Sequence, residues 1–156
     1  HKHYKKWSEE MGQEYTDYGL VGENLTIDDF DEKLIKIGDE FKVGSCKLQV
    51  SQPRIPCYKI GIKMNSRDFP KMFSSSGLLG SYLRVIETGS IKNGDELKLV
   101  KTDSDSLSLY DISDILFNDI KNIEKMKAAL DLKYLTEEIK ERFRERLMKL
   151  GDFDSL

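Results

Sequence analysis

The chain has 156 residues, enough for one domain with a buried core, or for one domain and a small appendage. Its 25 basic and 28 acidic side chains give a net charge of −3, which argues against a protein that binds nucleic-acid polymers, since these carry a basic surplus. No apolar run approaches the roughly 18 residues that a membrane span requires. The two cysteines, Cys46 and Cys57, make no disulfide framework, so we expect a reducing, cytoplasmic location.

The first periodic segment predicts an amphipathic helix over residues 3–15. Tyr4, Trp7 and Met11 recur at spacings of three and four, which places them on one helix face. Gly22 then precedes a short run over residues 23–26. A glycine at this place marks either a plain tight turn or a point where the backbone lets a ligand approach closely, and both interpretations stay open.

A period of two between residues 34 and 50 predicts strands. Cys46, Leu48 and Val50 fall on one face of the second strand, so we assign Cys46 to the core as a small hydrophobic residue. The segment 35–43 recurs in similar form at 91–99, and in both copies a Gly-Asp pair precedes an alternating strand. We therefore expect two similar turn-strand units in one sheet system.

The segment 50–57 leads from a strand through Pro53 and Pro56 to Cys57. Each proline fixes its own φ and favours extended backbone at the residue before it, so the approach to Cys57 is stiff. Arg54 lies three residues before the cysteine and would supply a positive field that favours the thiolate. Two interpretations remain: a functional thiol that is held in place, or an inert, buried cysteine in a loop interrupted by prolines.

The part of the chain between the two similar units mixes helix, loop and strand signals. Residues 67–73 predict a helical turn, residues 74–77 a flexible Ser-Gly loop, and residues 83–88 a return to strand. The loop at Ser75 and Ser76 would be able to present backbone amides to an anion, although a simple linker fits the same composition.

A polar stretch over residues 101–106 separates the strands from a helical tail. Thr136, followed by two glutamates, begins the last helix, and Gly151 ends it. Three short helices have little core of their own, so we expect the tail to dock on the rest of the chain or across a homodimer. The apolar stripe that would dock consists of Leu116, Ile120, Ile123, Phe143 and Leu147.

Four motifs, in this order along the chain, resemble the signature of the MOSC domain, the C-terminal domain of molybdenum cofactor sulfurase. They are Gly22-Glu23-Asn24-Leu25-Thr26, Ile37-Gly38-Asp39, Gln52-Pro53-Arg54-Ile55-Pro56-Cys57 and Gly89-Ser90-Ile91-Lys92-Asn93-Gly94-Asp95. The helical tail is similar to the three-helix extension of the YiiM-like branch of this family. The family's first strands and its Gly-rich, His-containing segment are absent ahead of His3, so the cofactor contacts of that segment cannot be assigned here.

The resemblance implies a mainly β fold with some helix. A MOSC-type β-barrel would occupy residues 1–103, and a small three-helix bundle would follow over residues 104–156. It also implies that the protein binds the molybdenum cofactor, a pterin dithiolene with a phosphate, with Cys57 as molybdenum ligand and catalytic residue. Relatives reduce N-hydroxylated compounds, such as hydroxylaminopurine-type bases, with electrons from a separate redox partner. A family-level association with pyridoxal phosphate comes with the same resemblance.

The chemistry of the matching residues agrees with this assignment. A soft thiolate suits a sulfur-rich metal centre, and the planar guanidinium of Arg54 suits the pterin phosphate. Asn24 and Leu25 carry over as a cofactor-facing turn, and we add Arg84 as a cofactor-binding candidate from its local chemistry alone. Two other functions stay open: a carrier in which Cys57 holds a persulfide or shuttles cofactor without turnover, and a binding module whose tail recruits a partner.

Overall fold

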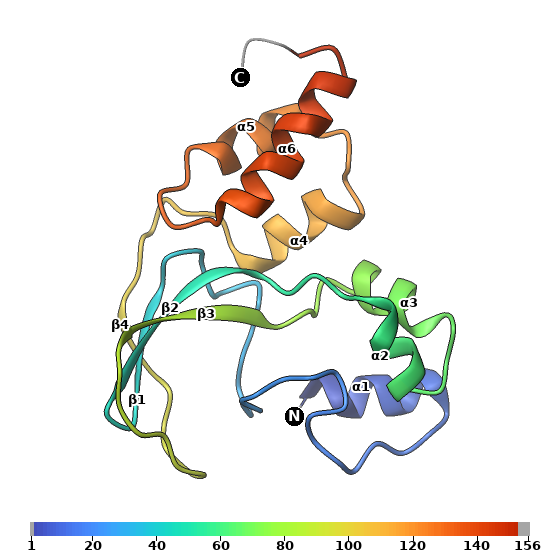
Figure 1. Cartoon of the computed structure of the whole chain (residues 1–156), viewed down its shortest axis with the longest axis vertical. Coiled ribbons are helices and arrows are strands. Elements are labelled where there is room, and N and C mark those ends of the chain that lie inside the picture. The colour runs from blue at the N-terminus through green and yellow to red at the C-terminus, as the bar shows by residue number, and fades with distance from the viewer. Residues whose placement is uncertain (1, 153–156) are drawn as a thin grey trace.

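An antiparallel sheet lies in the middle of the molecule, with helices gathered on two sides of it (Figure 1). The computed structural model describes residues 2–152. Its strands are β1 (Glu40–Val43), β2 (Cys46–Pro53), β3 (Ser81–Glu87) and β4 (Lys98–Lys101). Its helices are α1 (Lys2–Met11), α2 (Tyr58–Lys63), α3 (Phe69–Ser75), α4 (Leu109–Phe117), α5 (Ile123–Leu130) and α6 (Glu137–Lys149). Helices α1, α2 and α3 lie together on one side, and α4, α5 and α6 form a separate group on the other.

The described strands do not close into the expected β-barrel. Their order is β3-β2-β1-β4 with antiparallel pairing throughout, which leaves β3 and β4 as the two edges of an open sheet. Closure would require these edges to pair with each other or with further strands. Both edges instead carry exposed apolar side chains, among them Val85 at 56% and Leu99 at 52%. Residues 2–152 therefore form an open four-stranded sheet with six helices.

The two similar turn-strand units are neighbours in this sheet, as predicted. Strands β1 and β4 pair antiparallel with Phe41 opposite Leu99, and the register shifts between Glu40 and Phe41. Cys46 begins β2 opposite Val43 and is 6% exposed in a small apolar cluster that also includes Leu48. The assignment of Cys46 to the core is confirmed.

Helices α4, α5 and α6 share one hydrophobic core with the sheet. The sheet side contributes Ile37, Phe41 and Val50, and the tail contributes Leu109, Ile112, Ile115, Leu116, Met126, Ala129, Leu135, Ile139, Phe143 and Leu147. Thr136 is the N-cap of α6, as predicted, but its hydroxyl bonds to the side chain of Gln52 on β2 rather than to the helix backbone. The prediction is wrong for Ile120, which belongs to the predicted stripe but is 44% exposed and does not join this core. The tail docks on the sheet, and no helix within residues 2–152 has the length and apolar character needed to cross a membrane.

A second core, rich in aromatic rings, joins α1 to α2 and α3. The Trp7 ring of α1 is 2% exposed and lies 5.7 Å from Phe69 and 5.1 Å from Phe73 of α3, measured between ring centroids. The predicted N-terminal helix is confirmed, but it ends at Met11 because Gly12 turns the chain with a φ of +61°. Helix α2 was not predicted, since Gly61 in its middle and two prolines before it both argue against a helix.

The expected flexible loop over residues 74–77 is wrong in its first half. Ser74 and Ser75 are the last residues of α3, and their hydroxyls donate to the helix carbonyls of Pro70 at 2.7 Å and Lys71 at 2.9 Å. Ser76 likewise donates to the carbonyl of Phe73 at 2.7 Å. Serines that bond back to their own helix are compatible with a last helical turn, which composition alone does not reveal.

Candidate functional site

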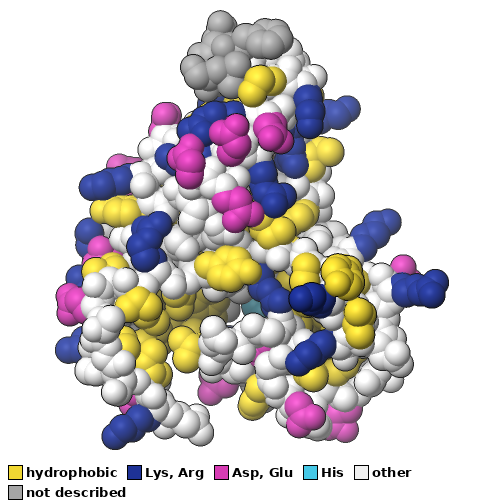
Figure 2. Space-filling view, viewed as in Figure 1, with side chains coloured by type: hydrophobic (Ala, Val, Ile, Leu, Met, Phe, Trp, Pro, Cys, Tyr) yellow, Lys and Arg dark blue, Asp and Glu magenta, His cyan; other side chains and the backbone are white. Residues whose placement is uncertain are grey.

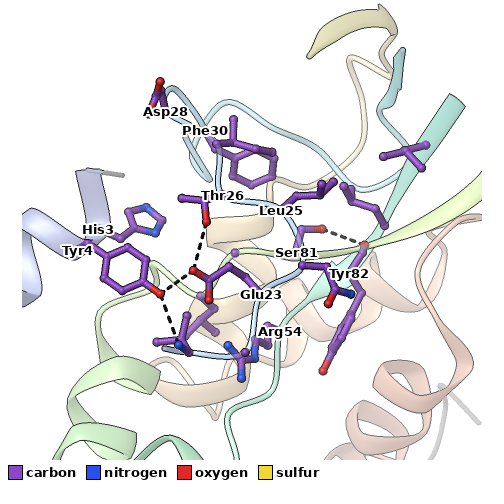
Figure 3. A pocket seen from close by; sticks show the side chains of 18 of the residues that line it. His3, Tyr4, Glu23, Leu25, Thr26, Asp28, Phe30, Arg54, Ser81 and Tyr82 are labelled. Atoms are coloured by element: carbon purple, nitrogen blue, oxygen red, sulfur yellow. Dashed lines mark hydrogen bonds between the residues drawn. The ribbon is translucent and has the colours of Figure 1, made fainter. Parts of the chain in front are cut away.

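A cavity of about 520 Å³ lies between α1, the segment that follows it, and the β2–β3 side of the sheet (Figure 3). This size is typical of small-molecule and cofactor sites. Aromatic and aliphatic side chains such as Phe30, Leu79 and Leu83 form part of its wall. The polar and charged side chains of the wall include His3, Tyr4, Glu23, Asn24, Thr26, Asp28, Arg54, Ser81 and Tyr82.

The Glu23 carboxylate organises one part of the cavity wall. Its Oε1 accepts hydrogen bonds from the Tyr4 hydroxyl at 2.5 Å, the Gly19 amide at 2.7 Å and the Thr26 hydroxyl at 3.3 Å. Burial by itself would raise the pKa of Glu23, but these hydrogen bonds, the one from Tyr4 first, outweigh it and lower the pKa. Burial, followed by the bond to Glu23, raises the pKa of Tyr4, so the phenol keeps its proton.

Arg54 is half-buried in the same wall and lacks an anionic partner among the described residues. Its guanidinium carbon lies 5.8 Å from the centroid of the Phe73 ring, and its Nη1 is buried with no hydrogen-bond acceptor within residues 2–152. A buried donor without an acceptor costs about 1–3 kcal/mol, and more when it is charged. Gly22, at a φ of +82°, brings the backbone so close that a Cβ there would lie 3.4 Å from Arg54 Nη2. This combination of an unpaired guanidinium and a glycine turn suits an anionic ligand group.

A second carboxylate, Glu32, lies almost fully buried beside the cavity. Its side chain is 1% exposed, and its Oε1 accepts from the Gly80 amide at 3.1 Å. His3, which lines the cavity, places its Nε2 at 3.2 Å from Glu32 Oε2, within ion-pair distance but without hydrogen-bond geometry. This contact brings an imidazole from the start of α1 next to the buried carboxylate at the cavity wall.

Cys57 does not line the cavity. The thiol is exposed, and the residue is the N-cap of α2 with extended backbone (φ −120°, ψ 165°) and no side-chain capping bond. Arg54 and Cys57 are three positions apart in the chain, so their Cα atoms are at most about 11 Å apart. The stiff Pro-containing segment therefore connects two groups: the half-buried guanidinium of Arg54 at the cavity and the solvent-exposed thiol of Cys57.

The remaining predicted site residues are split between the cavity and other places. Asn24 and Leu25 line the cavity together with Arg54. Arg84 on β3 does not, and its Nη1 donates to Gln49 Oε1 on β2 at 2.8 Å. Ser75 and Ser76 are also absent from the wall and bond to their own helix. Cofactor binding by these residues stays a prediction.

Sequence reasoning missed four side chains of this site. Tyr4 looked like a core residue of an amphipathic helix, and nothing in the spacing indicates that it pairs with Glu23, which lies 19 residues later. His3 and Glu32 are 29 residues apart, so their contact depends on how α1 packs against the following segment. Only Glu23 carried a signal, because it stands within the Gly22–Thr26 motif.

Comparisons of the sequence with known proteins identify a family and several similar proteins. A family model for the MOSC domain matches residues 1–98. The uncharacterized protein YflK of Bacillus subtilis is 30% identical over 149 residues, which cover 96% of this chain and 67% of YflK. Protein YiiM of Escherichia coli is 33% identical over 106 residues, covering 67% of this chain and 47% of YiiM. A protein named Reductase from Gibberella moniliformis is 31% identical over 117 residues, covering 73% of this chain and 21% of the reductase.

A solved structure extends the likeness to the fold. The crystal structure of YiiM from Geobacillus stearothermophilus superposes with a TM-score of 0.88 at 34% sequence identity, over 94% of this chain and 74% of that chain. The chain belongs to the MOSC domain family and has a YiiM-like fold. MOSC domains are associated with the molybdenum cofactor, whereas the comparisons give no support to the association with pyridoxal phosphate.

Proposed function

We propose that this protein binds the molybdenum cofactor and reduces N-hydroxylated compounds, with hydroxylaminopurine-type bases as the substrate class. A separate redox protein supplies the electrons. Membership of the MOSC family supports the cofactor, and a relative that bears the name Reductase supports redox activity. The observation that carries the proposal is the unpaired, buried Nη1 of Arg54 in a cavity of suitable size.

The residues at the cavity fit the chemical groups of this cofactor. The phosphate and the dithiolene are anionic. Arg54 offers them a charged donor, because no described residue accepts a hydrogen bond from its Nη1. The turn at Asn24 and Leu25 lines the same cavity. Cys57 does not line the cavity, but it lies three positions after Arg54 in the chain and would provide the soft thiolate that molybdenum favours. When bound, the cofactor supplies the metal-centred redox chemistry that no protein side chain here provides.

The protein's own residues would bind the substrate and hold protons. Reduction of an N-hydroxyl group breaks the N–O bond, takes up two electrons and two protons, and releases water. His3, held by Glu32, can carry a proton at its imidazole, and Glu23 fixes the Tyr4 hydroxyl at the same wall. Phe30 and Tyr82 are among the residues that line the cavity, and their aromatic rings suit a planar base.

One observation favours a second function, that of a sulfur or cofactor carrier. The Cys57 thiol is exposed and is not part of the cavity wall, which suits transfer of a persulfide or a bound cofactor to another protein. In this function the protein would have no turnover of its own. The same cysteine serves both proposals, so variants of Cys57 alone do not separate them.

A turnover measurement separates the two functions. Protein loaded with cofactor is mixed with an N-hydroxylated base and dithionite, and the amine product is followed by chromatography. Reductase function predicts repeated turnover, whereas a carrier predicts none and instead restores activity to a cofactor-free molybdoenzyme. Failure of the loaded protein to form any amine would overturn the reductase proposal.

A further inference from the structure

Helix α2 and the segment that leads into α3 expose apolar and basic side chains beside Cys57. Tyr58 is 72% exposed and Ile62 is 71% exposed, which are high values for large hydrophobic residues. They stand four residues apart on a helix, so they share one face. Figure 2 shows hydrophobic side chains gathered over the region of α2 and α3, with basic side chains around them.

Four basic side chains belong to the same stretch of the chain as this apolar face. Lys59 and Lys63 belong to α2, Arg67 stands between the helices, and Lys71 belongs to α3; all four are exposed. Within residues 2–152 no ion pair forms with any of them. One acidic residue, Asp68, falls in the same stretch. The chain as a whole has a net charge of −3, so this basic area is a local reversal of the overall charge.

We infer that this surface, formed by Tyr58, Lys59, Ile62, Lys63, Arg67 and Lys71, docks an acidic electron-donor protein that carries a flavin or an iron–sulfur cluster. The inference rests on the proposed function, which requires electrons from outside the chain. Each N–O bond that is broken takes two electrons, which come from one fully reduced flavin or from two one-electron iron–sulfur proteins in turn. A basic rim steers an acidic partner, and a small apolar centre gives it short-range contact.

The place and size of the surface suit such a partner. The surface begins at Tyr58, directly after the exposed Cys57. Arg54, which lines the cavity, lies three positions before Cys57 in the chain. A docked donor would therefore approach the proposed molybdenum ligand from its solvent side. Redox encounters are among the smallest specific interfaces, below about 1,200 Å² in total, and two apolar residues with a charged rim match that class.

The binding test uses nitrogen-15-labelled protein without cofactor and two acidic probes, an FMN-bearing flavodoxin and a plant-type ferredoxin. Titration at low ionic strength should perturb amide signals in residues 57–71 for at least one probe, and the affinity should fall steeply as salt rises to about 0.2 M. Lys59→Glu with Lys63→Glu should weaken binding at least about tenfold. The matched control, Lys42→Glu with Lys92→Glu, makes the same charge change on exposed residues of the sheet region and should leave affinity unchanged.

Several outcomes would overturn the docking surface. The first is that neither probe binds, or that a probe perturbs amide signals on another face of the protein. The second is that both double variants lose the same affinity for the probe. The third is that the wild type self-associates and the Lys59/Lys63 variant does not. Turnover separates this inference from the proposed function. The Lys59/Lys63 variant should lose donor-driven turnover about tenfold and keep dithionite-driven turnover. If the loaded wild type is inactive with dithionite, the proposed function fails, while the titration still decides the docking surface.

Discussion

At the residue scale, Arg54 has an unusual position: it is a half-buried cation for which residues 2–152 provide no anionic partner. Arg54→Met keeps the apolar stem that packs near Phe73 and removes the charge. We expect the cofactor-free variant to unfold at the same or a higher urea concentration than wild type, because an unpaired buried donor is lost. We expect its cofactor affinity to fall about ten- to a hundredfold, with Arg54→Lys in between, since lysine keeps the charge without the bidentate geometry.

Urea unfolding and calorimetric titration with the cofactor measure the two effects separately. A structural role predicts the opposite pair of results, a less stable cofactor-free protein with unchanged cofactor affinity. That outcome would remove Arg54 from the site.

Glu23 gives the molecule a predicted pH dependence of stability. Its pKa is lower in the folded protein than the ordinary value of 4.5, so its ionised form stabilises the fold above about pH 4.5. This contribution is lost as the pH falls through the lowered pKa. We therefore expect the difference in unfolding free energy between wild type and Glu23→Gln to be largest near neutral pH and to shrink on acidification.

Urea unfolding between about pH 7 and pH 3 tests this expectation. Tyr4→Phe removes the hydroxyl that donates to Glu23. In a Tyr4→Phe background, the effect of Glu23→Gln on the unfolding free energy should therefore depend less on pH. A difference between wild type and Glu23→Gln that stays constant over the whole range would show that Glu23 is not held in the way described.

The sequence predicted the motif residues of the site better than their surroundings. The Pro-Arg-x-Pro-Cys and Gly-Glu-Asn-Leu-Thr segments are local, so their residues were recognisable without a structure. The contacts of Tyr4 with Glu23 and of His3 with Glu32 depend on tertiary packing, which no local period contains. The position of the Cys57 thiol outside the cavity wall was equally hidden, because backbone stiffness does not say where a side chain points.

At the element scale, the tail and the sheet depend on one another. Phe143 of α6 is fully buried in the cluster that contains Phe41 and Val50 of the sheet. Phe143→Ala should lower the free energy of unfolding by about 3–5 kcal/mol. Met148→Ala, at a residue 40% exposed on the same helix, should change it by less than about 0.5 kcal/mol.

Hydrogen exchange shows whether the tail unfolds with the sheet. We expect the slowest amides of α6 and β2 to exchange together in Phe143→Ala, because a shared core opens as one unit. By the same reasoning, deletion of the chain after Ser104 should unfold the sheet instead of leaving a stable remainder. Fast exchange in α6 with full protection in β2 would instead support an independent tail, as the predicted division at residue 103 implies.

Helix periodicity predicted α1, α4, α5 and α6 because each has a clear apolar face. It did not predict α2, whose six residues include Gly61 and follow two prolines. Propensity is a weak prior for such a short helix, and packing of Ile60 and Met64 against the aromatic core of α1 and α3 stabilises it instead. The side that faces away from this core carries Tyr58 and Ile62, on which the docking inference depends.

At the scale of the whole molecule, alternation along the strands predicted a sheet but not its closure. The similarity between residues 35–43 and 91–99 predicted that β1 and β4 belong to one sheet, and the two strands are neighbours in it. Whether the edges of a sheet meet depends on strand number, tilt and stagger, which period-two patterns do not contain. The barrel was expected from family resemblance, and the described strands form an open sheet instead.

We propose above all that this chain holds the molybdenum cofactor through Cys57. The most direct measurement is the molybdenum and pterin content, by mass spectrometry, of protein purified from a host that makes the cofactor. Wild type and Cys46→Ser should both retain molybdenum with pterin, although the buried hydroxyl at position 46 should cost about 1–3 kcal/mol of stability. Cys57→Ser should fold normally and lose the molybdenum. Equal molybdenum and pterin in Cys57→Ser and wild type, or none in a correctly folded wild type, would contradict the claim.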